Sequence, residues 1–333
     1  MQYPVDIRLN RRDFLYTASA SSLTLMLPGT SAASVQPLDR PVKIGVIADL
    51  HHDIMHDGPA RLDAFVNDMT ASEVNAIIQL GDFAYPTPKN ADLIDRFNNA
   101  HRHPLHVIGN HDTDAGFTKD DCLKAWKIPH RYYATDIQGI HLLVLDANDR
   151  GSPTHSGGYP SFIGEEQLRW LKEQLETLEG PIIVASHQPL AGAYAIDNAT
   201  EIQDVLGNAA SKIILAINGH SHIDEVIRIQ NVTYMHINSA SYKWVGGNHQ
   251  HHSYSEQVHS EHPWVSYTCP YSDPLFARLD VNPNTQTIRV TGQRSSWVGP
   301  SPAELGLDMH PNLTNGEQIA PRIRDREFVR ARI

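Results

Sequence analysis

The sequence contains little cysteine, no long apolar run and no excess of positive charge. Its only cysteines, Cys122 and Cys269, could form one disulfide or remain buried thiols, and their spacing fits no zinc-binding pattern. No stretch of about 18 or more apolar residues occurs, so we expect no transmembrane segment. The 27 Lys and Arg are outnumbered by 38 Asp and Glu, for a net charge of −11, which argues against nucleic acid as the main partner.

Two catalytic patterns are also absent. The chain has no Gly-x-Ser-x-Gly elbow and no glycine-rich loop of the kind that cradles phosphate, so no side chain is indicated as a covalent nucleophile. Hydrophobic residues make up 41% and charged residues 20% of the 333 residues. This balance is typical of globular proteins and fits one large domain or two small ones.

Residues 1–33 have the character of a targeting segment. They contain the run Asn-Arg-Arg-Asp-Phe-Leu at residues 10–15, a mildly apolar stretch up to Leu27, and small residues at 30–33. This order resembles a twin-arginine export signal; an amphipathic N-terminal helix is the alternative. We therefore expect residues 1–33 to be a signal peptide and the protein to be exported, to the periplasm or outside the cell.

Five short polar motifs follow runs that are short, apolar and rich in Ile and Val, as is typical of buried strands. Open α/β sheets place their ligand sites at the carboxyl ends of the strands, so the motifs should meet at one edge. Together they supply enough oxygen and nitrogen ligands for two metal ions. The motifs are Asp49-Leu50-His51, Gly81-Asp82, Gly109-Asn110-His111-Asp112, Ser186-His187 and Gly219-His220-Ser221-His222.

Strand-like and helix-like runs alternate over residues 42–218, which predicts the α/β class. Apolar residues at helical spacing predict helices over 59–71, 90–101, 118–127 and 164–178. Between residues 225 and 293 the pattern changes to antiparallel strands with tight turns, interrupted by an irregular insertion at 239–273. We expect the folded domain to span residues 40–295 and residues 296–333 to form an arm or tail.

The motifs, in this order and at this spacing, resemble those of the calcineurin-like metallophosphoesterases over about residues 42–290. The resemblance implies a four-layer αββα sandwich, with two mixed β-sheets face to face and helices outside. It also implies metal-dependent hydrolysis of phosphoric esters.

The resemblance assigns seven ligands to two metal ions. Asp49, His51 and His222 would bind the first ion, Asn110, His187 and His220 would bind the second, and Asp82 would bridge both. Imidazole and carboxylate ligands suit Mn, Fe, Zn or Mg, including a mixed Fe(III)–M(II) pair. Ions that share a carboxylate would lie roughly 3.5–4 Å apart.

A charge count indicates the kind of substrate. Two divalent ions, two ligand carboxylates and a bridging hydroxide leave a net charge of about +1, which attracts a phosphate anion. The hydroxide is the expected nucleophile, because metal coordination lowers the pKa of water to about 7. In the family, the residue that matches His111 contacts the phosphoryl group and protonates the leaving oxygen, and we expect Asp112 to orient its imidazole.

The position of Tyr85 is ambiguous. Asp82 and Tyr85 together match the GDxxY motif of purple acid phosphatases, in which the tyrosine binds ferric iron. That branch lacks a histidine equivalent to His51, so we favour His51 as the ligand and predict that Tyr85 packs beside the metals.

Several further residues are candidates for contact with the substrate. Asp146 follows a predicted strand and could approach the mouth of the site, although a loop-capping role is equally compatible. Tyr242 and Trp244 open the 239–273 insertion, whose aromatic residues could form a cap over the substrate. The insertion is also rich in histidine, but the irregular spacing disfavours a third metal.

The sequence leaves the substrate open. A phosphoric monoester, a diester or a pyrophosphate of the nucleotide or CDP-alcohol type would each fit the motifs, and the organic part could derive from a small molecule, a phospholipid or a nucleotide. A monoester would favour extra cations near the phosphate, for which Arg150 and Lys243 are candidates. A non-catalytic scaffold of the same fold is disfavoured because no ligand is missing. The oligomeric state stays open.

Overall fold

The computed structural model describes residues 41–282, 284–285, 287–308 and 310–329, which belong to one compact unit spanning Pro37–Ile333. The predicted signal peptide at residues 1–33 lies outside the described residues. In the part of the chain that the structure describes, no helix has the length and apolar character needed to cross a bilayer.

The first sheet has six strands in the order β14-β13-β12-β1-β2-β3. Strands β1, β2 and β3 are parallel, whereas β12, β13 and β14 continue the sheet from β1 in antiparallel fashion. Strand β14 falls in the segment for which the sequence predicted no strand. The bounds are Val42–Ile47 (β1), Ala76–Gln79 (β2), Pro104–His106 (β3), Ala277–Asn282 (β12), Thr287–Thr291 (β13) and Arg326–Val329 (β14).

The second sheet also has six strands, in the order β4-β5-β6-β7-β9-β8. Its four central strands are parallel, and antiparallel strands lie at both edges. The sequence predicted β9 as purely antiparallel, but β9 pairs in parallel with β7 on its other side. The bounds are Tyr133–Ile137 (β4), Ile140–Val144 (β5), Ile182–Ser186 (β6), Ile213–Asn218 (β7), Glu225–Ile229 (β8) and Val232–His236 (β9).

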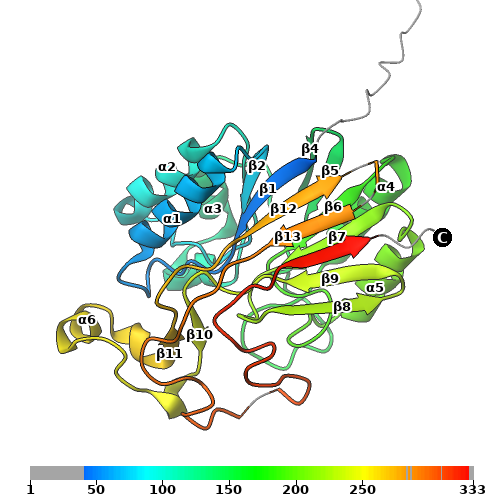
Figure 1. Cartoon of the computed structure of the whole chain (residues 1–333). Helices are drawn as coiled ribbons and strands as arrows, with labels where there is room; N and C mark the ends of the chain where they lie inside the picture. The colour runs from blue at the N-terminus through cyan, green and yellow to red at the C-terminus, as the bar shows by residue number, and fades with distance from the viewer. Residues whose placement is uncertain (1–40, 283, 286, 309, 330–333) are drawn as a thin grey trace, which may run out of the picture. The chain divides into compact units, whose positions relative to one another are not determined.

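The two sheets pack face to face, and helices cover their outer faces (Figure 1). Alternating residues of one strand point to opposite sides: Ile44 of β1 lies in the core between the sheets, whereas Ile47 packs against the helices of the first sheet. Ile183 and Val184 of β6 divide in the same way. The predicted four-layer αββα sandwich of two mixed sheets is confirmed.

Helices α1 (Gly58–Ala71), α2 (Ala91–Ala100) and α3 (Lys119–Trp126) cover the first sheet. Helices α4 (Glu165–Thr177) and α5 (Ala199–Asn208) cover the second. Four of these helices were predicted from apolar spacing, and α5 was not. Helix α3 begins with a capping box between Thr118 and Asp121, a local signal that fixes where the helix starts.

The 239–273 insertion folds back on itself rather than forming an irregular loop. It contains the paired strands β10 (Tyr242–Trp244) and β11 (Thr268–Pro270), the short helix α6 (Glu256–Glu261) and two 3-10 turns, Gly247–His249 and Pro263–Tyr267. Cys122 and Cys269 are both buried free thiols, so the structure decides between the two alternatives for the cysteines.

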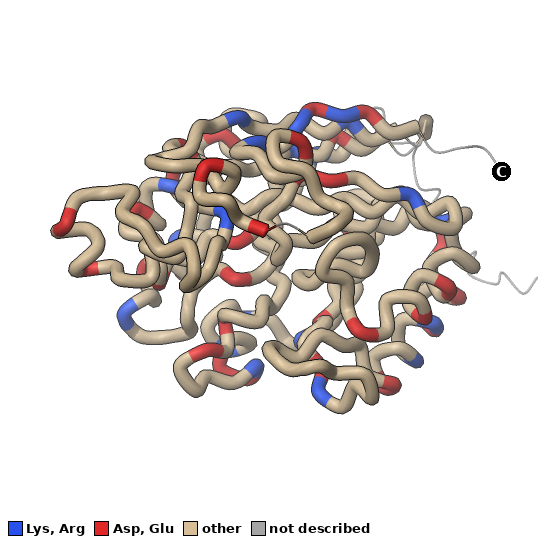
Figure 2. The backbone as a smooth tube through the Cα atoms, turned by 90° about the horizontal axis from the view of Figure 1, so that it is seen from below, with Lys and Arg blue, Asp and Glu red and all other residues tan. Residues whose placement is uncertain are grey.

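Charged residues are dispersed over the fold. Figure 2 shows segments with Asp or Glu interspersed with segments that carry Lys or Arg. The acidic excess of the sequence is therefore spread over many elements.

Candidate metal centre

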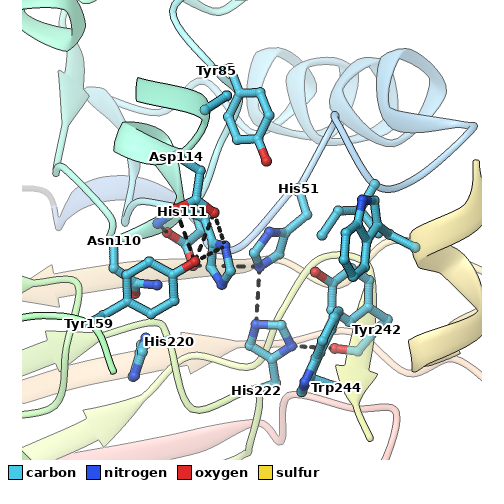
Figure 3. A pocket seen from close by; sticks show the side chains of 14 residues that line it. His51, Tyr85, Asn110, His111, Asp114, Tyr159, His220, His222, Tyr242 and Trp244 are labelled. Carbon is cyan, nitrogen blue, oxygen red and sulfur yellow. Dashed lines mark hydrogen bonds and ion pairs between the residues drawn. The ribbon is translucent and has the colours of Figure 1, made fainter. Parts of the chain in front are cut away.

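The five motifs converge where the two sheets meet at the carboxyl ends of their parallel strands. Three motifs follow β1, β2 and β3 of the first sheet, and two follow β6 and β7 of the second. Figure 3 shows side chains from both groups facing one cavity, as the sequence predicted from strand ends alone.

Asp49, His51 and His222 form the first cluster, in which one ligand atom from each residue lies within 4.8 Å of the others. The Nε2 atoms of His51 and His222 face each other at 3.3 Å, and Nε2 of His222 lies 3.3 Å from Oδ1 of Asp49. The other ring nitrogen of His222, Nδ1, donates to the carbonyl oxygen of Tyr242 at 2.8 Å. This hydrogen bond leaves the Nε2 lone pair free for a cation.

Asp82, His187 and His220 form the second cluster within the same distance limit. Nδ1 of His187 donates to the carbonyl oxygen of Leu80 at 2.7 Å, so its Nε2 is the free nitrogen. That atom lies 3.3 Å from Nδ1 of His220 and 3.1 Å from Oδ1 of Asn110. All four predicted ligand side chains therefore meet here.

The carboxylate of Asp82 lies between the clusters. Its Oδ2 atom is 3.6 Å from Nε2 of His51 and 3.2 Å from Nε2 of His187. Its Oδ1 atom accepts a hydrogen bond from the backbone N–H of His111 at 2.8 Å, which fixes the orientation of the carboxylate. One carboxylate that reaches both clusters is what a bridging ligand requires.

The electrostatics of the site favour cations. Burial lowers the pKa of His51 and of His220 to about 3, so these rings are neutral and offer lone pairs. Burial also acts to lower the pKa of His187, but the neighbouring Asp82 carboxylate outweighs it and raises that pKa to about 9. A metal ion would displace this proton, as metal binding generally does.

Several ligands adopt a backbone conformation that side chains rarely take. Asp49, His51, Asp82, His220 and His222 all have positive φ, between 47° and 65°. Such strain clusters at functional sites and persists only where surrounding contacts hold it. Here the N–H of Asp49 donates to the carbonyl oxygen of Gly81, and the N–H of His51 donates to that of Asp82.

The donor set fits two divalent ions. The clusters are buried apart from the partly exposed His220, they consist of imidazole and carboxylate groups, and ring nitrogens of neighbouring histidines approach each other to 3.3 Å. Imidazole and carboxylate ligands of this kind suit first-row divalent metals and Mg²⁺. Among the residues that the structure describes, no third group of this kind is found, and the histidines of the 239–273 insertion therefore form no comparable cluster.

Asp112 holds the backbone of the site and does not orient His111. Its buried carboxylate accepts hydrogen bonds from the N–H groups of Asp82, Phe83 and Gly109 at 2.8–2.9 Å, and from Ala84 at 3.2 Å. Burial and the nearby Asp82 raise its pKa to about 7. The prediction that Asp112 positions the imidazole is wrong, because these four amides already occupy its oxygens.

Asp114 contacts His111 instead. Nδ1 of His111 lies 2.8 Å from Oδ2 of Asp114, and the Tyr159 hydroxyl donates to the same carboxylate at 2.8–2.9 Å. Asp82 and Asp114 together outweigh burial and raise the pKa of His111. Asp114 and Tyr159 were not predicted from the sequence. The position of Asp114, three residues after His111, was a local signal that could have identified it.

The site opens into a cavity of about 670 Å³. Tyr242 lies on its wall and stacks on the ring of His51, with centroids 4.9 Å apart. Trp244 is 40% exposed and Trp264 is 54% exposed, and both line the same cavity. Tyr85 also lines it, and burial raises the pKa of Tyr85 to about 12. His51 belongs to the first cluster with Asp49 and His222, and the role of Tyr85 stays a prediction.

Asp146 stands behind the site rather than at its mouth. Its fully buried carboxylate accepts from Lys119 at 2.6 Å and from Arg131 at 2.7 Å. It also accepts from the backbone N–H of Asn148, whose side chain binds the carbonyl oxygen of Ile108. Asp146 therefore supports the loop before Asn110 and does not face the substrate cavity.

The two candidate cations do not line this cavity, although the hollow that contains Arg150 adjoins it. Lys243 is buried and donates to the carbonyl oxygen of Ser221 at 2.9 Å; burial lowers its pKa to about 8. Arg150 lines a neighbouring hollow with Asn110 and Tyr159. Neither is among the residues that line the 670 Å³ cavity.

Comparison with known proteins agrees with this geometry. The sequence model of the family described as calcineurin-like phosphoesterase matches residues 42–224. A dimetal phosphatase from Danio rerio is similar in structure, with 15% identity, 78% of this chain and 99% of that chain covered, and a TM-score of 0.55. No curated protein matches the sequence significantly.

Two further solved structures share the fold. A purple acid phosphatase from yellow lupin (Lupinus luteus) seeds has 11% identity, with 87% of this chain and 54% of that chain covered and a TM-score of 0.54. GAP50, the anchor in the inner membrane complex of Plasmodium, has 16% identity, with 78% and 85% covered and a TM-score of 0.52. Identities this low carry information about the fold alone.

Proposed function

Since this chain belongs to the calcineurin-like phosphoesterase family, we propose that it is a dinuclear-metal hydrolase of phosphoric mono- or diesters. The observation that carries the proposal is the position of Asp82, whose Oδ2 atom lies between two clusters of free imidazole nitrogens. A site built to bridge two cations is the arrangement used to clamp a phosphoryl group.

The residues of the site would hold the metals that bind the phosphoryl group and would supply a proton to the leaving oxygen. Two divalent ions, when bound, polarise the phosphoryl oxygens and make water a stronger acid. In hydrolysis a water oxygen forms the new bond to phosphorus, the ester P–O bond breaks, and the leaving oxygen takes up a proton. His111 is the candidate donor of that proton, because Asp114 and Asp82 favour its charged form.

Two alternatives use the same fold. A pyrophosphatase acting on nucleotides or CDP-alcohols would need the same ligands, and the aromatic wall formed by Tyr242 and Trp244 is compatible with it. A non-catalytic scaffold is disfavoured, since all seven predicted ligands are present and face one another.

We also propose that the protein is exported. The support is the twin-arginine-like run at residues 10–15 and the apolar and small residues that follow it. Mass measurement of the protein recovered from a periplasmic extract tests this, and recovery of the intact chain only from the cytoplasm would reject it.

The proposed activity is tested with purified protein loaded separately with Mn, Zn, Fe or Mg. Elemental analysis should give two metals per chain, and at least one loaded form should hydrolyse monoesters, diesters or nucleotide diphosphates. Asp82→Asn should lose metal and activity together, whereas Asp63→Asn, at an exposed side chain paired with Arg96, should behave as the unmodified protein. A fully loaded protein that cleaves none of these substrates would reject the proposal.

A further inference from the structure

Among the residues that the structure describes, no lysine or arginine lines the substrate cavity. Its non-ligand lining consists of one carboxylate, that of Asp114, and of aromatic and small apolar side chains. Positive charge on the wall of this cavity would therefore come mainly from bound metals, while Lys119 and Arg150 line an adjoining hollow that shares Asn110 and Tyr159 with it. The lining residues other than the predicted ligands are Ile54, Tyr85, His111, Asp114, Ala115, Tyr159, Tyr242, Trp244 and Trp264.

The two walls of the cavity differ in chemistry. Figure 3 shows His111, Asp114 and Tyr159 on one side and Tyr242 and Trp244 on the other. His51 stands between the walls: its ring centroid is 5.2 Å from that of His111 and 4.9 Å from that of Tyr242. A leaving oxygen in contact with the His111 ring lies at the first wall, on the side of the cavity opposite Tyr242 and Trp244. The aromatic wall then faces whatever group stays on the phosphorus.

The aromatic wall consists of Tyr242, Trp244 and Trp264, and Tyr267 packs against both of its tryptophans. Tyr267 stacks on Trp244 with ring centroids 5.6 Å apart and planes at 14°, and it packs against Trp264 at 5.0 Å. Trp244 comes from β10 and Trp264 from the Pro263–Tyr267 turn. Both indoles stay substantially exposed within this stack, so they present a preorganised apolar surface to a ligand.

We propose that the substrate is a monoanionic phosphodiester whose retained ester group is a flat ring lying against Trp244 and Trp264. A monoester has no retained ester group, so it would leave this wall without a contact. It would also carry about two negative charges near pH 7, since its second pKa is about 6, and no described lysine or arginine lines the aromatic side of the cavity. This inference rests on the proposed phosphoesterase function and narrows its substrate class.

Three substrates that share the same leaving group, p-nitrophenol, test the inference. They are p-nitrophenyl phosphate, methyl p-nitrophenyl phosphate and phenyl p-nitrophenyl phosphate. Only the retained group differs, so differences in kcat/KM report what contacts it. The metal-loaded protein should prefer the phenyl diester over the methyl diester, and both over the monoester. Trp264→Ala and Trp244→Ala should each reduce the phenyl-to-methyl preference by about three- to tenfold, mainly through KM, as expected for lost aromatic contacts.

Controls separate this contact from a general loss of structure. Trp264→Phe should keep most of the preference, because it keeps a ring. Trp170→Ala, in α4 beside Tyr132 and outside the cavity, should leave the preference unchanged. As a readout independent of turnover, diphenyl phosphate should quench tryptophan fluorescence of the unmodified protein more than dimethyl phosphate does, and Trp264→Ala should remove most of that difference.

Two results would overturn the inference, and they differ in meaning. Faster hydrolysis of the monoester, or an unchanged phenyl-to-methyl ratio in both tryptophan variants, rejects the diester assignment and leaves the phosphoesterase function standing. Release of no p-nitrophenol from any of the three by protein that holds two metals rejects both proposals.

Discussion

The Nε2 atoms of His51 and His222 lie 3.3 Å apart in the interior of the protein. Nδ1 of His222 is committed to the carbonyl oxygen of Tyr242, so its Nε2 carries a lone pair that points at His51. Either a proton on Nε2 of His51 or a cation between the two rings would satisfy this lone pair. With Asp49 beside them, the two nitrogens form a group of ligand atoms close enough to hold one metal ion.

Removal of Asp82 should affect both metal positions. Because the Oδ2 atom of Asp82 reaches both clusters, Asp82→Ala should bring the metal content below one ion per chain. Asp49→Ala should still bind part of the metal ion of the second cluster. Metal that binds only the folded state stabilises it by about 2.7 kcal/mol at 100 times its Kd. Addition of Mn²⁺ or Zn²⁺ should thus raise the Tm of the unmodified protein and not that of Asp82→Ala. Equal metal content in both variants would contradict the bridging position.

Asp114 should act through His111. Its carboxylate holds Nδ1 of the imidazole at 2.8 Å, so Asp114→Asn should lower kcat by about 10–100-fold, the usual range for a partner that orients a functional histidine, while KM and metal content change little. The loss should be smaller for p-nitrophenyl esters than for alkyl esters, because a good leaving group needs less protonation. A uniform loss across leaving groups would argue for a purely structural role.

His111→Ala should lower kcat by about 10²–10⁴-fold, the range for loss of a general acid, and should retain both metals. Tyr159→Phe is the matched milder change, since it removes only the hydroxyl that contacts both Asp114 oxygens. Steady-state kinetics with elemental analysis on the same preparations checks both. Full activity of His111→Ala would remove it from the mechanism.

Gly109 should not tolerate a side chain. A Cβ at this position would overlap the backbone nitrogen and the carboxylate of Asp82, so Gly109→Ala should displace the bridging residue and reduce metal content. Gly247→Ala is the control, because its added Cβ would meet only an ordinary contact at 3.5 Å. Normal metal binding by Gly109→Ala would show that the loop relaxes without cost to the site.

Stability should fall in acid because of a buried histidine. Burial lowers the pKa of His106 to about 3, whereas an unfolded histidine titrates near 6.5. Between these values the unfolded chain binds more protons, so the free energy of unfolding should decrease as pH falls, by up to about 1.4 kcal/mol per pH unit. The contribution of neutral, buried His106 to the free energy of unfolding is fully present above about pH 6.5. Urea unfolding at several pH values gives the free energy of unfolding as a function of pH. The slope of this free energy against pH should be shallower for His106→Gln, but unchanged for His103→Gln at an exposed side chain.

The candidate metal ligands that the structure brings together were predictable because a strand end is a local signal. A short apolar run followed by Asp, Asn or His states both where the strand stops and which group stands at the sheet edge. Asp49 and Asp82 could be placed in this way without knowledge of the fold. The family resemblance then supplied what spacing alone could not, namely the assignment of each ligand to a metal.

The roles of Asp112 and Asp114 could not be separated in the sequence. Both follow His111 within three residues, and the nearer was the natural candidate to orient the imidazole. Both lie in one short 3-10 segment, whose backbone kinks only at Asp114 and Ala115. Asp114 contacts the imidazole, whereas Asp112 accepts hydrogen bonds from four backbone amides, and only the tertiary structure shows this division.

The sequence by itself determined the class of the fold and indicated the candidate ligands, because both depend on short runs of residues at strand ends. The reaction class was implied by the family resemblance. The tertiary structure alone decided which wall of the cavity is acidic and which is aromatic. Tyr159 and Trp264 reach the site from loops about a hundred residues apart, and their placement depends on how those loops pack across the two sheets. Contacts over such separations arise from burial and loop closure in three dimensions, and no local pattern records them.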